Sequence, residues 1–264
     1  MAGSSAGRGH HRGLGGTLRP AAGEEPVGQD PRAEQRLLIA QALEVVARDH
    51  FALAGSGALR EHGLTDRPTN DIDLFTVAAA LERFPQAVRS LVAHLEDNGH
   101  AVDIRRETPA FAQLSVATPS GTVIDIDLGV DWRAHTPVLL AIGPVLDHED
   151  AVANKLTALY SRGLPRDYLD VDSIRLSGAY TDESLIELLA SRDSGYNCEY
   201  FTECLRMASR ITLPEVRAYG IDAARLEAVQ ARFVQWAHHL DEHADAPEIA
   251  HEALPAIPQP EHDQ

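Results

Sequence analysis

The hydrophobic pattern of the chain changes at about residue 148. Before this point, short segments alternate apolar and polar residues, which is the period-two pattern of β-strands with one buried face. After it, apolar residues recur every three or four positions, which is typical of helices that bury one side. The sequence therefore predicts an α/β fold, in which a sheet domain with flanking helices precedes an all-helical domain.

The boundaries of the expected elements follow from these periods and from the Gly and Pro residues between them. In the first half we expect a helix at 33–49, a buried strand at 51–55, a short helix that follows the Gly-Ser-Gly turn at 55–57 and ends at Gly63, a strand at 71–76, a helix at 85–98, and strands at 100–107, 111–118 and 122–129. In the second half we expect helices at 149–163, 165–178, 181–193, 197–211 and 221–242.

Both ends of the sequence lack a hydrophobic period. Residues 1–32 are rich in Gly, Ala and Pro, and residues 245–264 carry four prolines among acids. Such compositions do not bury enough apolar surface to fold, so we expect two disordered tails. The expected domains are then a sheet domain at 33–147 and a helical domain at 148–244.

The charge of the chain limits its partners. With 23 basic and 40 acidic residues, the net charge is −17, and the chain lacks the general positive surface that non-specific binding to nucleic acid or anionic membranes requires. The first residues lack the apolar middle of a signal peptide, and no later stretch approaches the length of a membrane span. We therefore expect a soluble cytoplasmic protein without membrane contact.

Lysine is almost absent from the sequence. Of the 23 basic residues, 22 are Arg, and Lys155 is the single Lys. A position that keeps Lys in this background is a candidate for a site that needs a compact ammonium group in place of a planar guanidinium. Chance retention is the alternative.

Two expected strands carry pairs of acids. Asp71 and Asp73 are two residues apart, as are Asp125 and Asp127, so each pair lies on one face of its strand. If the strands are neighbours, the second can add a third carboxylate to the first pair. Mg²⁺ prefers carboxylate and phosphate oxygens, and a two-metal site stabilises both the attacking and the leaving oxygen of a phosphoryl transfer. A solvated strand end is the alternative.

A Gly-Ser turn precedes the first acid pair. Gly55 and Ser56 lie where a strand turns into a helix, and small residues there let backbone N–H groups approach a triphosphate. An ordinary turn is the alternative when this motif is taken alone.

The order and spacing of these motifs resemble those of a known superfamily. The string LAGSGALREHGLTDRPTNDIDLF (53–75), with a third acid on a later strand, resembles the signature of the polymerase-β-like nucleotidyltransferases. With VANKLTALYSRGLPRDYLDVDSI (152–174), it is similar to the AbiEii-type nucleotidyltransferase toxins, which include the MenT enzymes. The resemblance covers roughly residues 35–175. The chain departs from many relatives in having Gly-Ser-Gly where they have Gly-Gly-Thr.

The resemblance implies a nucleotidyltransferase-fold mixed sheet with flanking helices, and transfer of a nucleoside monophosphate from an NTP with release of pyrophosphate. It also implies two Mg²⁺ ions, with Asp71 and Asp73 as metal-binding residues and Thr69 near the metal. Gly55 and Ser56 would bind the nucleotide phosphates, and Lys155 would contact the triphosphate. Asp170 matches the acid that the family has on the next helix.

Further residues of these motifs complete the expected site. We expect Asp125, in preference to Asp127, to be the third metal-binding carboxylate and the base, because it comes early in its strand between apolar neighbours. We expect Arg162 to help Lys155 neutralise the transferring phosphate. Arg166 and Asp167 lie in the same motif without separable roles.

Three functions are compatible with these motifs. The family resemblance favours a toxin that adds nucleotides to tRNA and is held in check by an antitoxin. Nucleotidylation of a small molecule such as an antibiotic uses the same site, and the negative net charge favours it. An inactive binding protein with this fold is the third possibility, and the intact motif residues argue against it.

Overall fold

The fold places a mixed sheet before a group of helices, as expected. The computed structural model describes residues 31–69 and 71–244, so the expected tails at 1–32 and 245–264 lie outside the described residues except for positions 31 and 32. These two already belong to the first helix. Among the described helices, none combines the length and apolar character that crossing a bilayer requires.

Seven strands form one sheet in the order β3-β4-β5-β2-β1-β7-β6. β1 pairs in parallel with β7 and β2 in parallel with β5, while the other neighbours are antiparallel. The strands are β1 (Ala52–Leu53), β2 (Asp71–Thr76), β3 (Ala101–Thr108), β4 (Phe111–Ala117), β5 (Val123–Val130), β6 (Val138–Leu140) and β7 (Gly143–Val145). The sequence did not predict β6 and β7.

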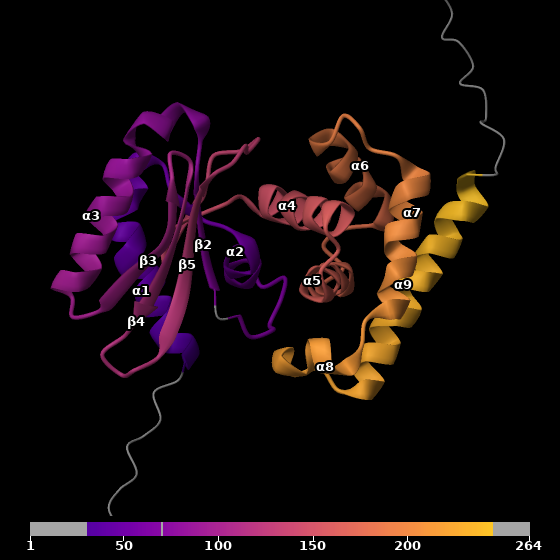
Figure 1. The fold of residues 1–264 in the computed structure, drawn as a ribbon. Helices are drawn as coiled ribbons and strands as arrows, with labels where there is room; N and C mark the ends of the chain where they lie inside the picture. Colours follow the sequence, from indigo (N-terminus) through magenta and orange to yellow (C-terminus); the bar gives the residue numbers. More distant parts are fainter. Residues whose placement is uncertain (1–30, 70, 245–264) are drawn as a thin grey trace, which may run out of the picture. The chain divides into compact units, whose positions relative to one another are not determined.

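Helices flank the sheet and then form the rest of the described chain (Figure 1). The α-helices are α1 (Pro31–Val46), α2 (Gly55–Glu61), α3 (Phe84–Asp97), α4 (His148–Ser161), α5 (Pro165–Leu176), α6 (Asp182–Arg192), α7 (Cys198–Arg206), α8 (Leu213–Val216) and α9 (Ala223–Ala244). Short 3-10 helices are η1 (Ala47–Asp49), η2 (Ala78–Arg83), η3 (Met207–Arg210) and η4 (Arg217–Tyr219). The sequence did not predict α8 and η4. The predicted fold class is confirmed.

The two faces of the sheet differ in chemistry. In β5 the side chains of Ile124, Ile126 and Leu128 are buried, while the acids between them point to the opposite face. α1 and α3 lie together on one side of the sheet and α2 lies on the other (Figure 1). α3 buries residues at helical spacing from Phe84 to Leu95, as an amphipathic helix does.

Nearly all of the buried apolar side chains of the described residues belong to one cluster, which extends from Leu38 in α1 to Ala237 in α9. The strands end at Val145, and the helices that follow begin with α4 at His148. The division of the chain into two domains at residue 147 stays a prediction.

Candidate active site

The four acids of the two Asp-x-Asp motifs meet on one face of the sheet. β2 and β5 are parallel neighbours, with Asp71 opposite Asp125 and Asp73 opposite Asp127. Neighbouring strands are about 4.8 Å apart, and side chains two residues apart share a face. The condition set by the sequence, that the two strands lie side by side, is therefore met.

The carboxylates of this face crowd one another. Burial raises the pKa of Asp73 to about 6, the Asp71 charge adds to this rise, and Lys155 opposes it. Burial also raises the pKa of Asp127, although the Gln113 amide donates a hydrogen bond to its carboxylate at 2.9 Å. Both carboxylates thus hold a proton more readily than free ones do, and the nearby cations Lys155 and Arg166 do not offset this.

This donor set fits a divalent cation. Within 31–69 and 71–244, no three His, Cys, Asp or Glu side chains converge closely enough to form a ready-made metal centre. The crowded groups are nevertheless all carboxylates, the ligands that Mg²⁺ prefers together with phosphate oxygens. Asp71, Asp73 and either Asp125 or Asp127 are the side chains that could hold it. The choice of Asp125 stays a prediction, with Asp127 as its competitor.

The Gly-Ser turn lies directly against these acids. Gly55 has a φ of +55°, a left-handed conformation that other residues adopt at a cost. A Cβ atom added at Gly55 would also overlap the carboxylate of Asp73. Two features therefore require glycine at this position: the left-handed backbone of the turn, and the close approach of the turn to Asp73.

Asp170 ties the turn to the single lysine. Its buried carboxylate accepts hydrogen bonds from Ser56 Oγ at 3.0 Å and from Arg67 Nε and Nη2 at 2.6 and 2.7 Å, and it lies 2.9 Å from Lys155 Nζ. Arg67 also donates to Ser56 Oγ. Burial raises the pKa of Asp170, but the charge of Lys155 and the hydrogen bonds from Arg67 hold it below its ordinary value. The fully buried Asp170 therefore orients Ser56 and Lys155 and does not itself face open space.

Asp167 pairs with both Arg162 and Lys155. It lies in the first turn of α5 after Pro165, and it accepts a hydrogen bond from the backbone N of Leu164 at 3.2 Å. Its carboxylate also accepts from Arg162 at 3.0 and 3.1 Å and lies 3.3 Å from Lys155 Nζ. Asp167, whose role the sequence left open, thus fixes the two cations beside each other.

Two cavities of about 300 Å³ each border the acids, and their linings share no residue. The first, which we call the Lys155 cavity, is lined by Gly55, Asp73, Phe75, Asp131, Ala151, Asn154, Lys155, Thr157, Ala158, Ser161 and Arg162. The second, which we call the Tyr219 cavity, is lined by Arg67, Pro68, Thr69, Asp71, Asp125, Arg166, Ala218 and Tyr219.

The predicted site residues divide between these cavities. Lys155 and Arg162 share the first cavity with Gly55 and Asp73. Asp71 and Asp125 line the second with Thr69, which donates a hydrogen bond to Asp71. Ser56 and Asp170 line neither and are buried.

Comparison with protein families identifies the family of the chain. Residues 36–258 match the profile described as "Nucleotidyl transferase AbiEii toxin, Type IV TA system". The chain belongs to the AbiEii nucleotidyltransferase toxin family. It is therefore a nucleotidyltransferase, and the resemblance found in its motifs is confirmed.

Solved structures share the fold of this AbiEii chain at low sequence identity. MenT4, a nucleotidyltransferase toxin from Mycobacterium tuberculosis, is 17% identical with a TM-score of 0.53, over 80% of this chain and 91% of MenT4. JHP933 from Helicobacter pylori is 18% identical with a TM-score of 0.50, over 81% of this chain and 94% of JHP933. Curated protein sequences give no match.

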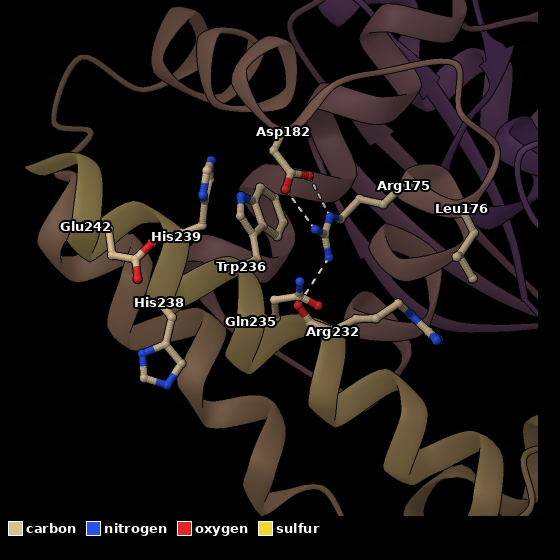
Figure 2. A pocket seen from close by; sticks show the side chains of 9 residues that line it. All are labelled: Arg175, Leu176, Asp182, Arg232, Gln235, Trp236, His238, His239 and Glu242. Atoms are coloured by element: carbon tan, nitrogen blue, oxygen red, sulfur yellow. Dashed lines mark hydrogen bonds and ion pairs between the residues drawn. The ribbon is translucent and has the colours of Figure 1, made fainter.

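A larger hollow of about 630 Å³ lies among the helices of this family member, and none of the four acids of β2 and β5 lines it (Figure 2). Arg175 pairs with Asp182 at 2.7 and 2.8 Å and stacks over Trp236, with 4.3 Å from its guanidinium carbon to the ring centroid. Arg232 pairs with Asp172, outside the hollow, at 2.6 and 2.7 Å. Both arginines are already paired with acids, and none of the predicted site residues lines this hollow.

Sequence reasoning missed several residues around the acids. Asn154 donates to Asp131 at 2.8 Å, and both line the Lys155 cavity. Arg67 lies within the recognised motif four residues before Asp71, but its bonds to Asp170 depend on a contact between distant segments. Tyr219 belongs to the unpredicted η4, and no motif marked it.

Proposed function

We propose that this chain transfers a nucleoside monophosphate from an NTP to a hydroxyl group of tRNA, as a toxin held in check by a cognate antitoxin, with Mg²⁺ bound by Asp71, Asp73 and Asp125. The observation that carries the proposal is the lining of the Lys155 cavity. It combines a carboxylate of the acid face, a glycine without room for a side chain, and two cations. A triphosphate with its metal needs this combination of charge and close backbone approach.

The chain's own residues then divide the work. Lys155 and Arg162 neutralise the charge that develops on the transferring phosphate and the leaving pyrophosphate. The acceptor oxygen bonds to the α-phosphorus, the bond between the α-phosphorus and the bridging oxygen breaks, and the hydroxyl proton passes to Asp125. When bound, the magnesium ions supply further charge neutralisation and lower the pKa of the acceptor hydroxyl.

Asp167 and Asp170 position the cations of the site by pairing with them. Together they hold the Lys155 ammonium at 3.3 and 2.9 Å in a site where only 6% of the lysine is exposed. An inactive binding protein has no need to keep this buried network intact. The network therefore supports an active transferase.

The acceptor has one competing identity. The net charge of −17 opposes the approach of a polyanionic RNA, which favours a small-molecule acceptor such as an antibiotic. The family match supports the toxin role, because it describes the family as toxins of a toxin–antitoxin system, and tRNA is the acceptor that the resemblance of the motifs implies for such a toxin.

The proposal is tested by incubating the purified chain with each labelled NTP, Mg²⁺ and total tRNA, and in parallel with a panel of aminoglycosides. We expect labelled tRNA, loss of labelling with EDTA, and its return with added Mg²⁺. Asp71→Ala removes a metal-binding carboxylate and should abolish transfer. Asp103→Ala, in an exposed pair with Arg105 on β3, is the matched control and should not change it.

Two results would contradict the proposal. If the folded wild-type chain labels no tRNA with any of the four NTPs, tRNA is not the acceptor, and labelling of an aminoglycoside would identify the small-molecule alternative. If Asp71→Ala retains wild-type transfer, the metal-site assignment is wrong. Circular dichroism and thermal unfolding establish that both variants keep the fold.

A further inference from the structure

The Tyr219 cavity borders the same acids as the Lys155 cavity but differs from it in chemistry. It contains Asp71 and Asp125 of the acid face, together with the aromatic ring of Tyr219. A transferase joins two reactants at one set of metal-binding carboxylates, so each reactant needs its own space next to them. With the NTP in the Lys155 cavity, the Tyr219 cavity offers the acceptor a space beside the same carboxylates.

The ring of Tyr219 is held in place by a contact with Arg67. The guanidinium carbon of Arg67 lies 5.0 Å from the ring centroid, which is within cation–π range. Arg67 is itself buried and fixed by two hydrogen bonds to Asp170, at 2.6 and 2.7 Å. The ring is only partly exposed and packs against the hydrophobic core. A ring ordered in this way can stack on a flat ligand with little loss of entropy.

The remaining charge of the cavity suits a phosphate group. The Arg166 side chain is 35% exposed and lies 3.8 Å from Asp71, which is at the outer limit of an ion pair. Once Asp71 and Asp125 bind metal, Arg166 is left facing the cavity as a cation. An aromatic ring and a nearby arginine are the pair of contacts that single-stranded nucleic acids use, with bases stacked and phosphates paired. A polycationic acceptor such as an aminoglycoside would be repelled by Arg166.

The size of the cavity agrees with this ligand. At about 300 Å³ it lies at the lower end of ligand pockets. This is space for one nucleotide and not for a folded RNA element. Ala218, beside Tyr219, is exposed and adds no bulk to the lining.

We infer that the Tyr219 cavity receives the terminal nucleotide of the acceptor RNA, with the base stacked on Tyr219, its phosphate at Arg166, and its free hydroxyl toward Asp71 and Asp125. The inference rests on the proposed function, because it uses the same carboxylates. It adds that the acceptor is recognised through an unpaired end by residues of the η4 turn.

Steady-state kinetics with tRNA as the varied substrate test this assignment. Tyr219→Leu removes the stacking surface, so we expect the KM for tRNA to rise roughly 5- to 150-fold, with kcat and the KM for NTP unchanged. Tyr219→Phe keeps the ring and should restore most of the lost affinity. Tyr200→Leu alters a 52% exposed tyrosine on α7 that lines neither cavity, and it should behave as wild type.

A second variant avoids the packing of Tyr219 against the core. Ala218→Glu changes an exposed residue of the cavity lining and adds a negative charge to the cavity that is expected to hold the RNA phosphate. It should raise the KM for tRNA without lowering the melting temperature. Ala79→Glu, at an exposed alanine of η2 outside both cavities, is its control.

Binding of a short 5′-labelled single-stranded RNA with a free 3′ end, followed by fluorescence anisotropy without NTP, separates this inference from the proposed function. If the wild-type chain transfers nucleotides to tRNA but Tyr219→Leu and Ala218→Glu leave both the KM and RNA binding unchanged, the inference is overturned and the proposed function stands. If the wild-type chain transfers nothing to tRNA, the proposed function fails. In that case the inference survives only if both variants weaken RNA binding and both controls do not.

Discussion

Replacement of Gly55 by alanine tests whether the turn and the carboxylate face act as one unit. The left-handed backbone at φ +55° costs an alanine about 1–2 kcal/mol. The lower entropy of alanine in the unfolded chain offsets about 0.4–1 kcal/mol of this. From the backbone alone we therefore expect the free energy of unfolding to fall by about 1 kcal/mol.

The larger effect is on the rate of transfer. The added Cβ overlaps the Asp73 carboxylate, so either the carboxylate or the turn must move by an ångström or more. A displacement of about 1 Å at a reacting centre lowers the rate by about 100-fold. We expect this loss mainly in kcat, because the displaced groups hold the reacting phosphate.

Gly63→Ala is the matched control. Gly63 has a similar left-handed conformation, at φ +73°, but a Cβ added there meets no atom within 4 Å. It should lower the free energy of unfolding by about 1 kcal/mol, measured by urea denaturation, and leave the transfer rate unchanged. The reasoning is refuted if Gly55→Ala keeps a rate within about threefold of wild type, or if both variants lose activity equally.

Three further predictions concern the charged network. Lys155→Arg should lower kcat about 100-fold, because a planar guanidinium cannot take the place of an ammonium held by two buried acids; a near-normal kcat would show that the lysine is incidental. Asp125→Asn should lower kcat more than Asp127→Asn, and the reverse order would make Asp127 the third metal-binding carboxylate. Asp170→Asn should cost about 3–5 kcal/mol of stability at pH 7, because it takes the paired carboxylate away from the buried Arg67 and leaves Lys155 with Asp167 alone. Since the pKa of Asp170 in the folded chain lies below its ordinary 3.8, this contribution is present above pH 3.8 and is lost as the pH falls below it, so urea midpoints of wild type and variant should converge in acid; a constant difference would contradict it.

The sequence predicts best what depends on local periodicity. β2 is found at 71–76 as expected, because the alternation of acids with Ile72 and Leu74 leaves one buried face. α2 begins at Gly55, three residues before the expected start, since the glycine itself makes the turn out of β1.

Elements that depend on distant partners were not predictable in the same way. β6 and β7 have three residues each, β7 contains Pro144, and β7 joins the sheet only by pairing with β1, which lies some ninety residues earlier in the chain. Proline is a weak signal for a strand, and a three-residue segment has too little pattern to show alternation.

The same distinction between local pattern and distant contacts applies to the residues of the candidate site. The sequence singled out Asp71, Asp73 and Lys155 through motif and composition. The role of Arg67 arises from Asp170, which lies 103 residues away, and from Tyr219 in a turn without a motif. Such groupings exist only once the helices pack against the sheet.

Because Lys155 is the single lysine, a reagent that reacts with amines can distinguish this side chain of the active site from all other side chains. Lys155 is the one side-chain amine in the sequence, and 6% of it is exposed. A succinimidyl ester, which acylates amines and ignores guanidinium groups, can therefore mark a side chain only where the triphosphate is expected to bind. Acylation that peptide mapping assigns to Lys155, as distinct from acylation of the α-amino group, reports how often this pocket opens, without any engineered probe.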